Sequence, residues 1–472
     1  MKGLRRLPFC IFNSISVTAF MTRKLSMSCE VSAVRKQTVV VVGSGAIGLL
    51  YGSRLLEAEQ TDASQELDVN FIFRRDFNHC STHGFRVKSP DGDYYSGKGQ
   101  NMVGKIHKDS STIKVPSEGV DWVICAVKSY SLDDNGSESL KSLIAPMVGK
   151  KTRFLLIMNG LNCQRFFCDW FGSTSVFVGM AFVCVNRNNP SLFIESSAIK
   201  EGDASDNFVL VDHIAFGALS IGHCENCPEE LETARKLWSS TKISSKVTVT
   251  TSLLHAQWSK LCWNIPFNGL SVALGGVSTD IIANDPDLRF IADRIMSDTI
   301  SLGNEDIMLH HKAELLAYRG EGVEPLLKTI DGEAVRHYCW NLTDNMGPYK
   351  SSTVLDLVRG NDLELEYLFN QPLERARIIT KVRRAQHHVA ALLTGSTQLS
   401  AKTVNSGDVK TAEGVEEEIE GKGKSEIEGT DWIHLETVVR QVNAISRMAL
   451  EKRKVSKSWS PTFILDTEGQ SA

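Results

Sequence analysis

The stretch VVVVGSGAIG, Val39–Gly48, constrains the fold more than any other part of the chain. Four β-branched residues predict a buried strand, and three glycines spaced G-x-G-x-x-G predict a tight turn into a helix. Such a turn offers the first N–H groups of the helix to phosphate groups. The alternative is a glycine-rich turn that binds nothing. The candidate nucleotide-binding residues are Gly43, Ser44, Gly45, Ala46, Ile47 and Gly48.

The rest of the chain predicts two domains. Strand patterns at 38–43, 69–73, 120–128 and 153–160 alternate with helical patterns, which indicates a doubly wound parallel sheet. From residue 252 the patterns become long and helical. We therefore expect a Rossmann-type domain over 37–251 and a mostly α-helical substrate domain over 252–472. The polar, glycine-rich stretch 395–430 predicts a disordered insertion in the second domain.

The first 36 residues have a composition of their own. They contain seven Lys and Arg residues and no acidic residue before Glu30, which is typical of a transit peptide for a mitochondrion or plastid. The apolar run 7–20 leaves a secretory signal open, and a disordered tail of a cytoplasmic protein is a further alternative. In each case the segment lies outside the predicted fold.

Charge and cysteine content exclude several classes of protein. A formal net charge of -4 gives no general attraction to nucleic acid or to anionic membranes. No apolar stretch is long enough to predict a membrane span. Eleven scattered cysteines do not indicate a disulfide framework, and the pair Cys224 and Cys227 predicts a loop rather than a metal site. We expect a small-molecule ligand and leave a homodimer open.

The residues after the second strand bear on the choice of cofactor. In a Rossmann unit this point meets the adenosine ribose, where an acid favours NAD and an arginine accommodates the 2′-phosphate of NADP. The strand here ends in Arg74 and Arg75, which favours NADPH/NADP+. Asp76 follows directly and keeps NAD as the alternative.

Polar residues suited to catalysis recur in three places. Lys128 and Asn159 each follow a predicted buried strand, at the edge where parallel sheets bind ligands. Lys260, Asn264 and Asn268 are spaced by four residues, so one helical face carries all three. A desolvated lysine among amides suits proton donation to a carbonyl group. The alternative is a solvent-exposed polar face.

Five motifs in fixed order resemble the ketopantoate reductase (2-dehydropantoate 2-reductase) family. They are GSGAIG, AVKSY, MNG, WSKLCWNIPFN and YKSSTVLDLVRGNDLELEYLF, spread between residues 43 and 369. The resemblance implies an NADPH-binding Rossmann domain followed by a helical domain similar to the C-terminal part of 6-phosphogluconate dehydrogenase. It implies NADPH-dependent reduction of 2-dehydropantoate to (R)-pantoate, with the substrate held between the domains.

The resemblance also implies roles for individual residues. Lys260 matches the catalytic lysine of the family, and Glu364 matches its active-site glutamate. The positions that match substrate-binding residues are Asn264, Asn268 and Ser352, and those that match cofactor-binding residues are Arg74, Lys128 and Asn159.

Three departures put ketopantoate itself in question. Pro266 should kink the helix and aim Asn268 differently. Ser278 stands where well-known members carry another asparagine, and the stretch 304–349 is long enough to reshape substrate choice. A reductase of another branched 2-oxo acid and a non-catalytic NADPH-binding regulator are therefore kept as alternatives.

Overall fold

The computed structural model describes residues 36–61, 67–74, 76–96, 105–188, 209–318, 326–393 and 430–455. The expected targeting segment and nearly all of the expected insertion lie outside these ranges, so both stay predictions. From Lys36 on, the chain forms one compact unit. The expected division into domains at residue 252 likewise stays a prediction.

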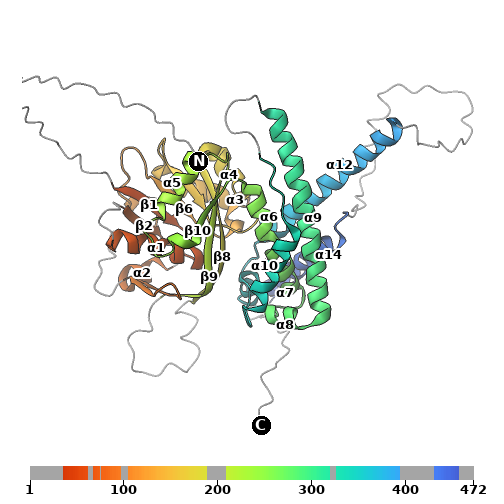
Figure 1. Cartoon of the computed structure of the whole chain (residues 1–472). Coiled ribbons are helices and arrows are strands. Elements are labelled where there is room, and N and C mark those ends of the chain that lie inside the picture. Colours follow the sequence, from red (N-terminus) through yellow and green to blue (C-terminus); the bar gives the residue numbers. More distant parts are fainter. Residues whose placement is uncertain are drawn as a thin grey trace, which may run out of the picture. The chain divides into compact units, whose positions relative to one another are not determined.

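The first half of the chain builds one sheet (Figure 1). The strand order is β4-β3-β9-β8-β7-β6-β1-β2-β5, and β10 pairs with β9. The strands are β1 (Gln37–Val42), β2 (Leu67–Ile72), β3 (Phe85–Lys88), β4 (Tyr94–Ser96), β5 (Ile106–His107), β6 (Trp122–Cys125), β7 (Arg153–Leu156), β8 (Val176–Asn188), β9 (Val209–His223) and β10 (Val247–Thr250).

Helices cover both faces of this sheet, as the sequence predicts. In β1 the side chains of Val39 and Val41 join one core cluster with α1, and those of Val40 and Val42 join another with α3. This alternation explains the unbroken apolar run, because a strand covered on both faces needs no polar side. The helices of this half are α1 (Ala46–Thr61), α2 (Phe77–His83), α3 (Asp134–Ile144), α4 (Arg165–Phe171) and α5 (Pro228–Leu237).

The sheet is mixed rather than purely parallel. The pairs from β5 to β8 are parallel, whereas β8 and β9 form a long antiparallel pair and β3 pairs with β4 in the same sense. Strand alternation in the sequence predicts the parallel core, which needs crossover helices. Strand alternation does not reveal the antiparallel pair β8 and β9, because antiparallel neighbours need no crossover helix. Past its pairing with β7, β8 continues from Gly179 against β9 alone.

The second half of the chain is helical, as predicted. Its own apolar core surrounds α6, in which Trp258 and Leu261 are fully buried. The helices are α6 (Leu253–Trp263), α7 (Gly269–Ala273), α8 (Thr279–Asn284), α9 (Pro286–Ala317), α10 (Gly332–Asp344), α11 (Ser352–Val358), α12 (Gln371–Leu393) and α14 (Ile433–Val455), with two π-helical turns, η7 (Asn264–Asn268) and η8 (Glu366–Asn370). Among the described helices, none combines the length and apolar composition needed to cross a bilayer.

Candidate active site

The glycine turn has the geometry of a phosphate-binding loop. Gly43 has a φ of 103°, and a Cβ there would lie 2.7 Å from the backbone of Ala126. A Cβ on Gly48 would lie 1.9 Å from the Gly43 carbonyl oxygen. The packing of the turn against the protein's own backbone therefore requires glycine at both positions, with or without a ligand. A Cβ on Gly45 would meet nothing closer than 4.0 Å, so the space in front of this glycine is open.

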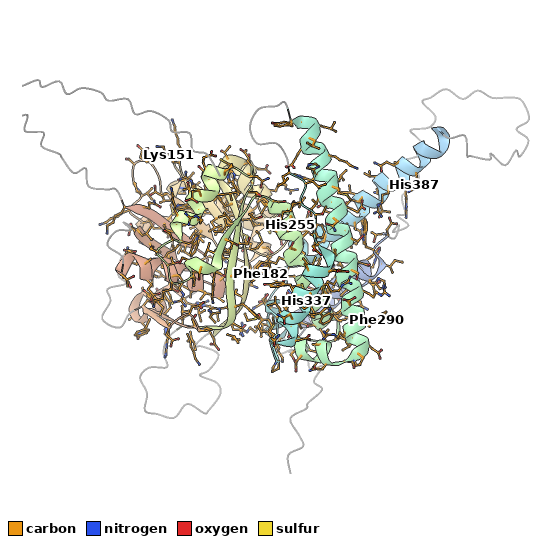
Figure 2. All side chains as sticks on the ribbon, viewed as in Figure 1. Lys151, Phe182, His255, Phe290, His337 and His387 are labelled. Carbon is orange, nitrogen blue, oxygen red and sulfur yellow. The ribbon has the colours of Figure 1, made fainter. Side chains whose placement is uncertain are left out.

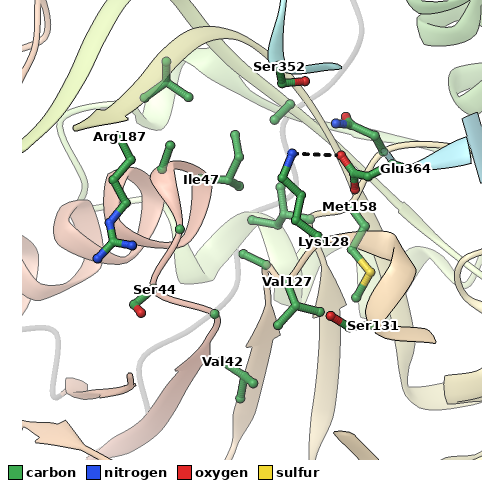
Figure 3. Close-up of a pocket in the computed structure, with 18 of the residues that line it drawn as sticks. Val42, Ser44, Ile47, Val127, Lys128, Ser131, Met158, Arg187, Ser352 and Glu364 are labelled. Carbon is green, nitrogen blue, oxygen red and sulfur yellow. Dashed lines mark hydrogen bonds and ion pairs between the residues drawn. The ribbon is translucent and has the colours of Figure 1, made fainter. Parts of the chain in front are cut away.

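A pocket of about 1040 Å³ opens at this turn (Figure 3). This volume is at the upper end of the usual range for small-molecule and cofactor sites. Residues from both halves of the chain line it. The sequence-predicted residues among them are Gly43, Ser44, Gly45, Ala46, Ile47, Arg74, Lys128, Asn159, Lys260, Asn264, Asn268, Ser352 and Glu364. Gly48 lies behind the turn.

Lys260 is buried, with 9% of its surface exposed. Its Nζ donates a hydrogen bond of 2.8 Å to Oδ1 of Asn159, which comes from the loop after β7. Burial lowers the pKa of Lys260 to about 8, although the Glu364 carboxylate acts in the opposite direction. An ammonium group with this pKa is mostly protonated at neutral pH and gives up its proton readily.

Asn264 and Asn268 follow Lys260 along the helix at intervals of about one turn, and they line the same pocket. Both are buried, and Nδ2 of Asn264 and Oδ1 of Asn268 have no hydrogen-bond partner among the described residues. Buried amide atoms usually have partners, so two bare ones facing a pocket indicate a polar ligand.

Pro266 does not turn Asn268 away from the pocket, contrary to our expectation. The helix passes through the proline as a π-helical turn, η7. Such a turn closes hydrogen bonds between residues five apart and so absorbs the missing proline N–H. Residues four apart stay nearly above one another, and the polar stripe remains continuous.

Glu364 holds Lys128 rather than Lys260 (Figure 3). Nζ of Lys128 lies 3.1 Å from Oε2 of Glu364 and 2.7 Å from Oδ2 of Asp356, and the Ser129 N–H donates to the other Glu364 oxygen. Burial alone would raise the pKa of Glu364, but Lys128 and the Ser129 N–H outweigh burial and lower it. Glu364 is therefore a carboxylate at neutral pH.

The influence of Glu364 on Lys260 is therefore indirect. Lys260 is positioned by Asn159, and Glu364 acts on it only through space. The loop that carries Asn159 is tied to η8, because the Leu161 N–H donates to the Tyr367 carbonyl. Gly160, in the same loop, has a φ of 108°, which favours glycine.

Other predicted residues lie where their motifs suggest. Ser352 is the first residue of α11 and lines the pocket, whereas Ser278 caps α8 away from it. Arg74 is exposed at the end of β2 and lines the pocket as well. The stretch 304–349 contributes Leu342, Met346 and Tyr349 to the lining.

Some residues of the site were not identified from the sequence. Asp356, which contacts Lys128, lies four residues after Ser352 on α11, a spacing that signals a shared face. Phe182 and Arg187 come from β8, whose register no pattern reveals. Phe182 lies between the sheet and the helices (Figure 2), with its ring 5.9 Å from Nζ of Lys260 and 6.3 Å from that of Tyr338.

The two cysteines of the pair Cys224 and Cys227 contact different partners. The Cys224 sulfur lies 3.7 Å from that of Cys168, and Cys227 donates to Glu229 instead. Within the described ranges, no group of three or more His, Cys, Asp or Glu gathers as metal ligands would.

Comparison with known proteins gives a consistent result. Residues 39–199 match the model of the family described as "Ketopantoate reductase PanE/ApbA", and 252–389 match that of its C-terminal part. A "2-dehydropantoate 2-reductase" of Nostoc sp. is 22% identical over 79% of this chain and 100% of its own length.

Solved structures share the fold. A 2-dehydropantoate 2-reductase from Geobacter metallireducens is 25% identical, with a TM-score of 0.55 over 76% of this chain and all of its own. A D-mandelate dehydrogenase, solved with NADH and anilino(oxo)acetate, is 13% identical, with a TM-score of 0.56 over 88% of this chain and all of its own. This chain belongs to the ketopantoate reductase family, whose enzymes are oxidoreductases acting on CH–OH groups.

Proposed function

We propose that the protein reduces 2-dehydropantoate to (R)-pantoate with NADPH, a step toward pantothenate and coenzyme A. One observation carries the proposal: Lys260 and Glu364, 104 positions apart in the chain, line the same pocket as the glycine turn. A protein that only binds a nucleotide has no need of a buried lysine with a pKa near 8. The name of the relative from Nostoc sp. supports the substrate.

In this proposal Lys260 is the general acid. Its Nζ would donate a proton to the 2-oxo oxygen, which becomes the hydroxyl oxygen of the product. Negative charge develops on that oxygen during reduction, so a positioned ammonium stabilises the transition state more than the neutral ketone. The Asn159 side chain holds Nζ in place. Asn264, Asn268 and Ser352 would bind the polar groups of the substrate.

The cofactor-binding end is formed by the glycine turn and Arg74. The fit is supported by the space in front of Gly45 and by the size of the pocket. When bound, NADPH would supply the hydride that reduces the 2-oxo carbon. Lys128, held by Asp356 and Glu364, would contribute a fixed ammonium hydrogen-bond donor beside it.

A second candidate substrate, another branched 2-oxo acid, is favoured by the apolar wall of the pocket. Phe182, Trp263, Leu342, Met346 and Tyr349 are all half-buried and line it. Partly exposed apolar side chains in a pocket gain from burial by a ligand, by about 25 cal/mol per Å² covered. A larger apolar side chain than that of 2-dehydropantoate would cover more of them.

The test is the loss of NADPH absorbance with a panel of 2-oxo acids: 2-dehydropantoate, 3-methyl-2-oxobutanoate, phenylglyoxylate and pyruvate. We expect the highest kcat/KM for 2-dehydropantoate, and a loss of activity in Lys260→Ala. The matched control is Lys151→Ala, since Lys151 is exposed (Figure 2). A preference for 3-methyl-2-oxobutanoate or phenylglyoxylate would favour the second candidate. Tight NADPH binding without turnover of any acid would indicate a non-catalytic regulator and contradict the proposal.

A further inference from the structure

We propose that Arg187 is a second determinant of cofactor choice: it neutralises Asp76 and, with Arg74, binds the 2′-phosphate of NADPH. The inference rests on the NADPH dependence proposed above and deepens it. No motif in the sequence marks Arg187, which lies on β8, 111 positions after Asp76.

The contact is direct and half-buried. Nη2 of Arg187 lies 2.5 Å from Oδ2 of Asp76, and the two side chains are 17% and 18% exposed. Both residues and Arg74 line the pocket. Figure 3 labels Arg187 and Ser44 of the glycine turn among the residues that line the pocket. The guanidinium therefore lies at Asp76, just after β2, where the adenosine ribose binds in a Rossmann unit, and in the same pocket as the loop that receives the pyrophosphate.

The backbone of β8 explains how a distant arginine reaches this point. The strand leaves β7 after Val178 and continues against β9 alone, with Arg187 opposite Val211. The long antiparallel pair thus carries a basic side chain across to the end of β2.

The ion pair changes what Asp76 can do. An acid after the second strand selects NAD because its carboxylate accepts from the ribose hydroxyls. Here Asp76 stands at the N-cap of α2 but makes no side-chain capping bond, because its carboxylate is turned to Arg187. The guanidinium competes with a ribose for the carboxylate oxygens. It also cancels the negative charge that would repel a 2′-phosphate.

Donors for a phosphate remain after the pair has formed. A guanidinium has five N–H donors, and Nε of Arg187 is buried with no hydrogen-bond partner among the described residues. Arg74 is exposed and forms no ion pair within the described ranges. The other nearby carboxylate, Asp109, accepts from the N–H and hydroxyl of Ser111. Arg74, Arg187 and Asp76 together carry a net charge of +1, which favours a phosphate over a hydroxyl.

The experiment measures binding of two cofactor fragments that lack nicotinamide, so no turnover is required. Isothermal titration calorimetry compares 2′-phospho-ADP-ribose with ADP-ribose on the full chain. We expect the wild type to prefer the phosphorylated fragment. Arg187→Gln should weaken its binding by about 10- to 100-fold, the effect of one lost charge-assisted hydrogen bond, and should leave ADP-ribose binding equal or tighter.

Further variants separate charge from structure. Arg187→Lys should recover part of the lost affinity, and Asp76→Asn should not weaken binding of the phosphorylated fragment. Adding Asp76→Asn to Arg187→Gln should remove any gain for ADP-ribose. The matched control is Arg153→Gln, which breaks a similar half-buried ion pair with Glu230 and should leave the ratio of affinities unchanged.

The outcomes distinguish this inference from the proposed function. If the wild type prefers 2′-phospho-ADP-ribose but Arg187→Gln keeps that preference, the role of Arg187 is wrong and NADPH dependence stands. An equal loss for both fragments would assign Arg187 to the pyrophosphate or to folding, and would overturn the inference. A wild type that binds ADP-ribose better, or neither fragment, contradicts the proposed cofactor and the inference together.

Discussion

Two lysines line one pocket and have opposite surroundings. Lys128, after β6, contacts two carboxylates, those of Asp356 and Glu364. Lys260, on α6, contacts the neutral amide of Asn159. Burial lowers the pKa of Lys260 to about 8. Burial also acts on Lys128, but the two carboxylates outweigh it and raise the pKa of that lysine above its ordinary value.

This difference assigns different chemistry to the same side chain. A lysine locked between carboxylates keeps its proton through any turnover and can only supply a fixed charge. A lysine buried beside an amide can give its proton up. Glu364 links the two, because it bonds to Lys128 and raises the pKa of Lys260 through space. Four substitutions or measurements can break or sharpen this contrast.

The largest effect is expected on turnover. Lys260→Met removes the proton donor and should lower kcat by about 10²- to 10⁴-fold, the usual range for general acid catalysis. Lys128→Met leaves the donor in place and should act more on the KM for NADPH than on kcat. Steady-state kinetics of both variants check this. A larger loss of kcat in Lys128→Met than in Lys260→Met would reverse the assignment.

The next effect concerns stability, where Lys128→Met should be the harmful change. It leaves Glu364 and Asp356 without their cation, and an uncompensated buried charge costs 3–5 kcal/mol in typical cases. We expect about 2 kcal/mol, because the Lys128 side chain is 36% exposed. Urea unfolding at pH 7 measures the loss, and the triple variant with Glu364→Gln and Asp356→Asn should recover most of it. No loss in Lys128→Met would mean that the pair contributes nothing to folding.

The sequence predicted one side of this contrast better than the other. The stripe Lys260, Asn264 and Asn268 follows from helical spacing, and it survived Pro266 because a π-helical turn keeps residues four apart on one side. The partners of Lys128 come from the segment just before η8 and from α11, more than 220 positions away. Contacts set by the packing of distant elements leave no periodic signal.

The same reason explains which parts of the fold could be predicted from the sequence. Glycine spacing and buried strands identify the parallel core through β7 and the helical half from residue 252. The antiparallel pair β8 and β9 escaped prediction because its residues satisfy no rule that separates them from parallel strands. Phe182 and Arg187, which that pair brings to the pocket, were missed with it.

A third effect follows from pH. The folded protein gives up the Lys260 proton near pH 8, whereas the unfolded chain keeps it to about 10.5. The unfolded state therefore binds more protons between these values, and the cost of burying Lys260 should shrink as pH rises through that window. Below pH 8, Lys260→Met should be more stable than the wild type by on the order of 1–3 kcal/mol. Urea unfolding of both proteins at pH 7 and 10 measures the difference, and an equal gap at both values would contradict a lowered pKa.

The smallest effect is a shift in the pH profile of catalysis. Because the protonated form of Lys260 is the donor, kcat/KM for reduction should fall above about pH 8. Asn159→Asp places a carboxylate next to Nζ of Lys260, which favours the ammonium form. The pH at which kcat/KM falls should therefore rise by about one unit. The repulsion between a new carboxylate and Glu364 limits the shift.

Asn162→Asp is the matched control for that shift. Asn162 lies in the same loop, but its amide donates to Gln371 rather than contacting Lys260. The variant adds the same charge nearby and should leave that pH within a few tenths of a unit. If both variants move the pH at which kcat/KM falls by the same amount, the total charge of the loop sets that pH, and the contact between residue 159 and Lys260 does not. If neither moves it, the titrating group is not Lys260, and the contrast between the two lysines would lose its kinetic basis.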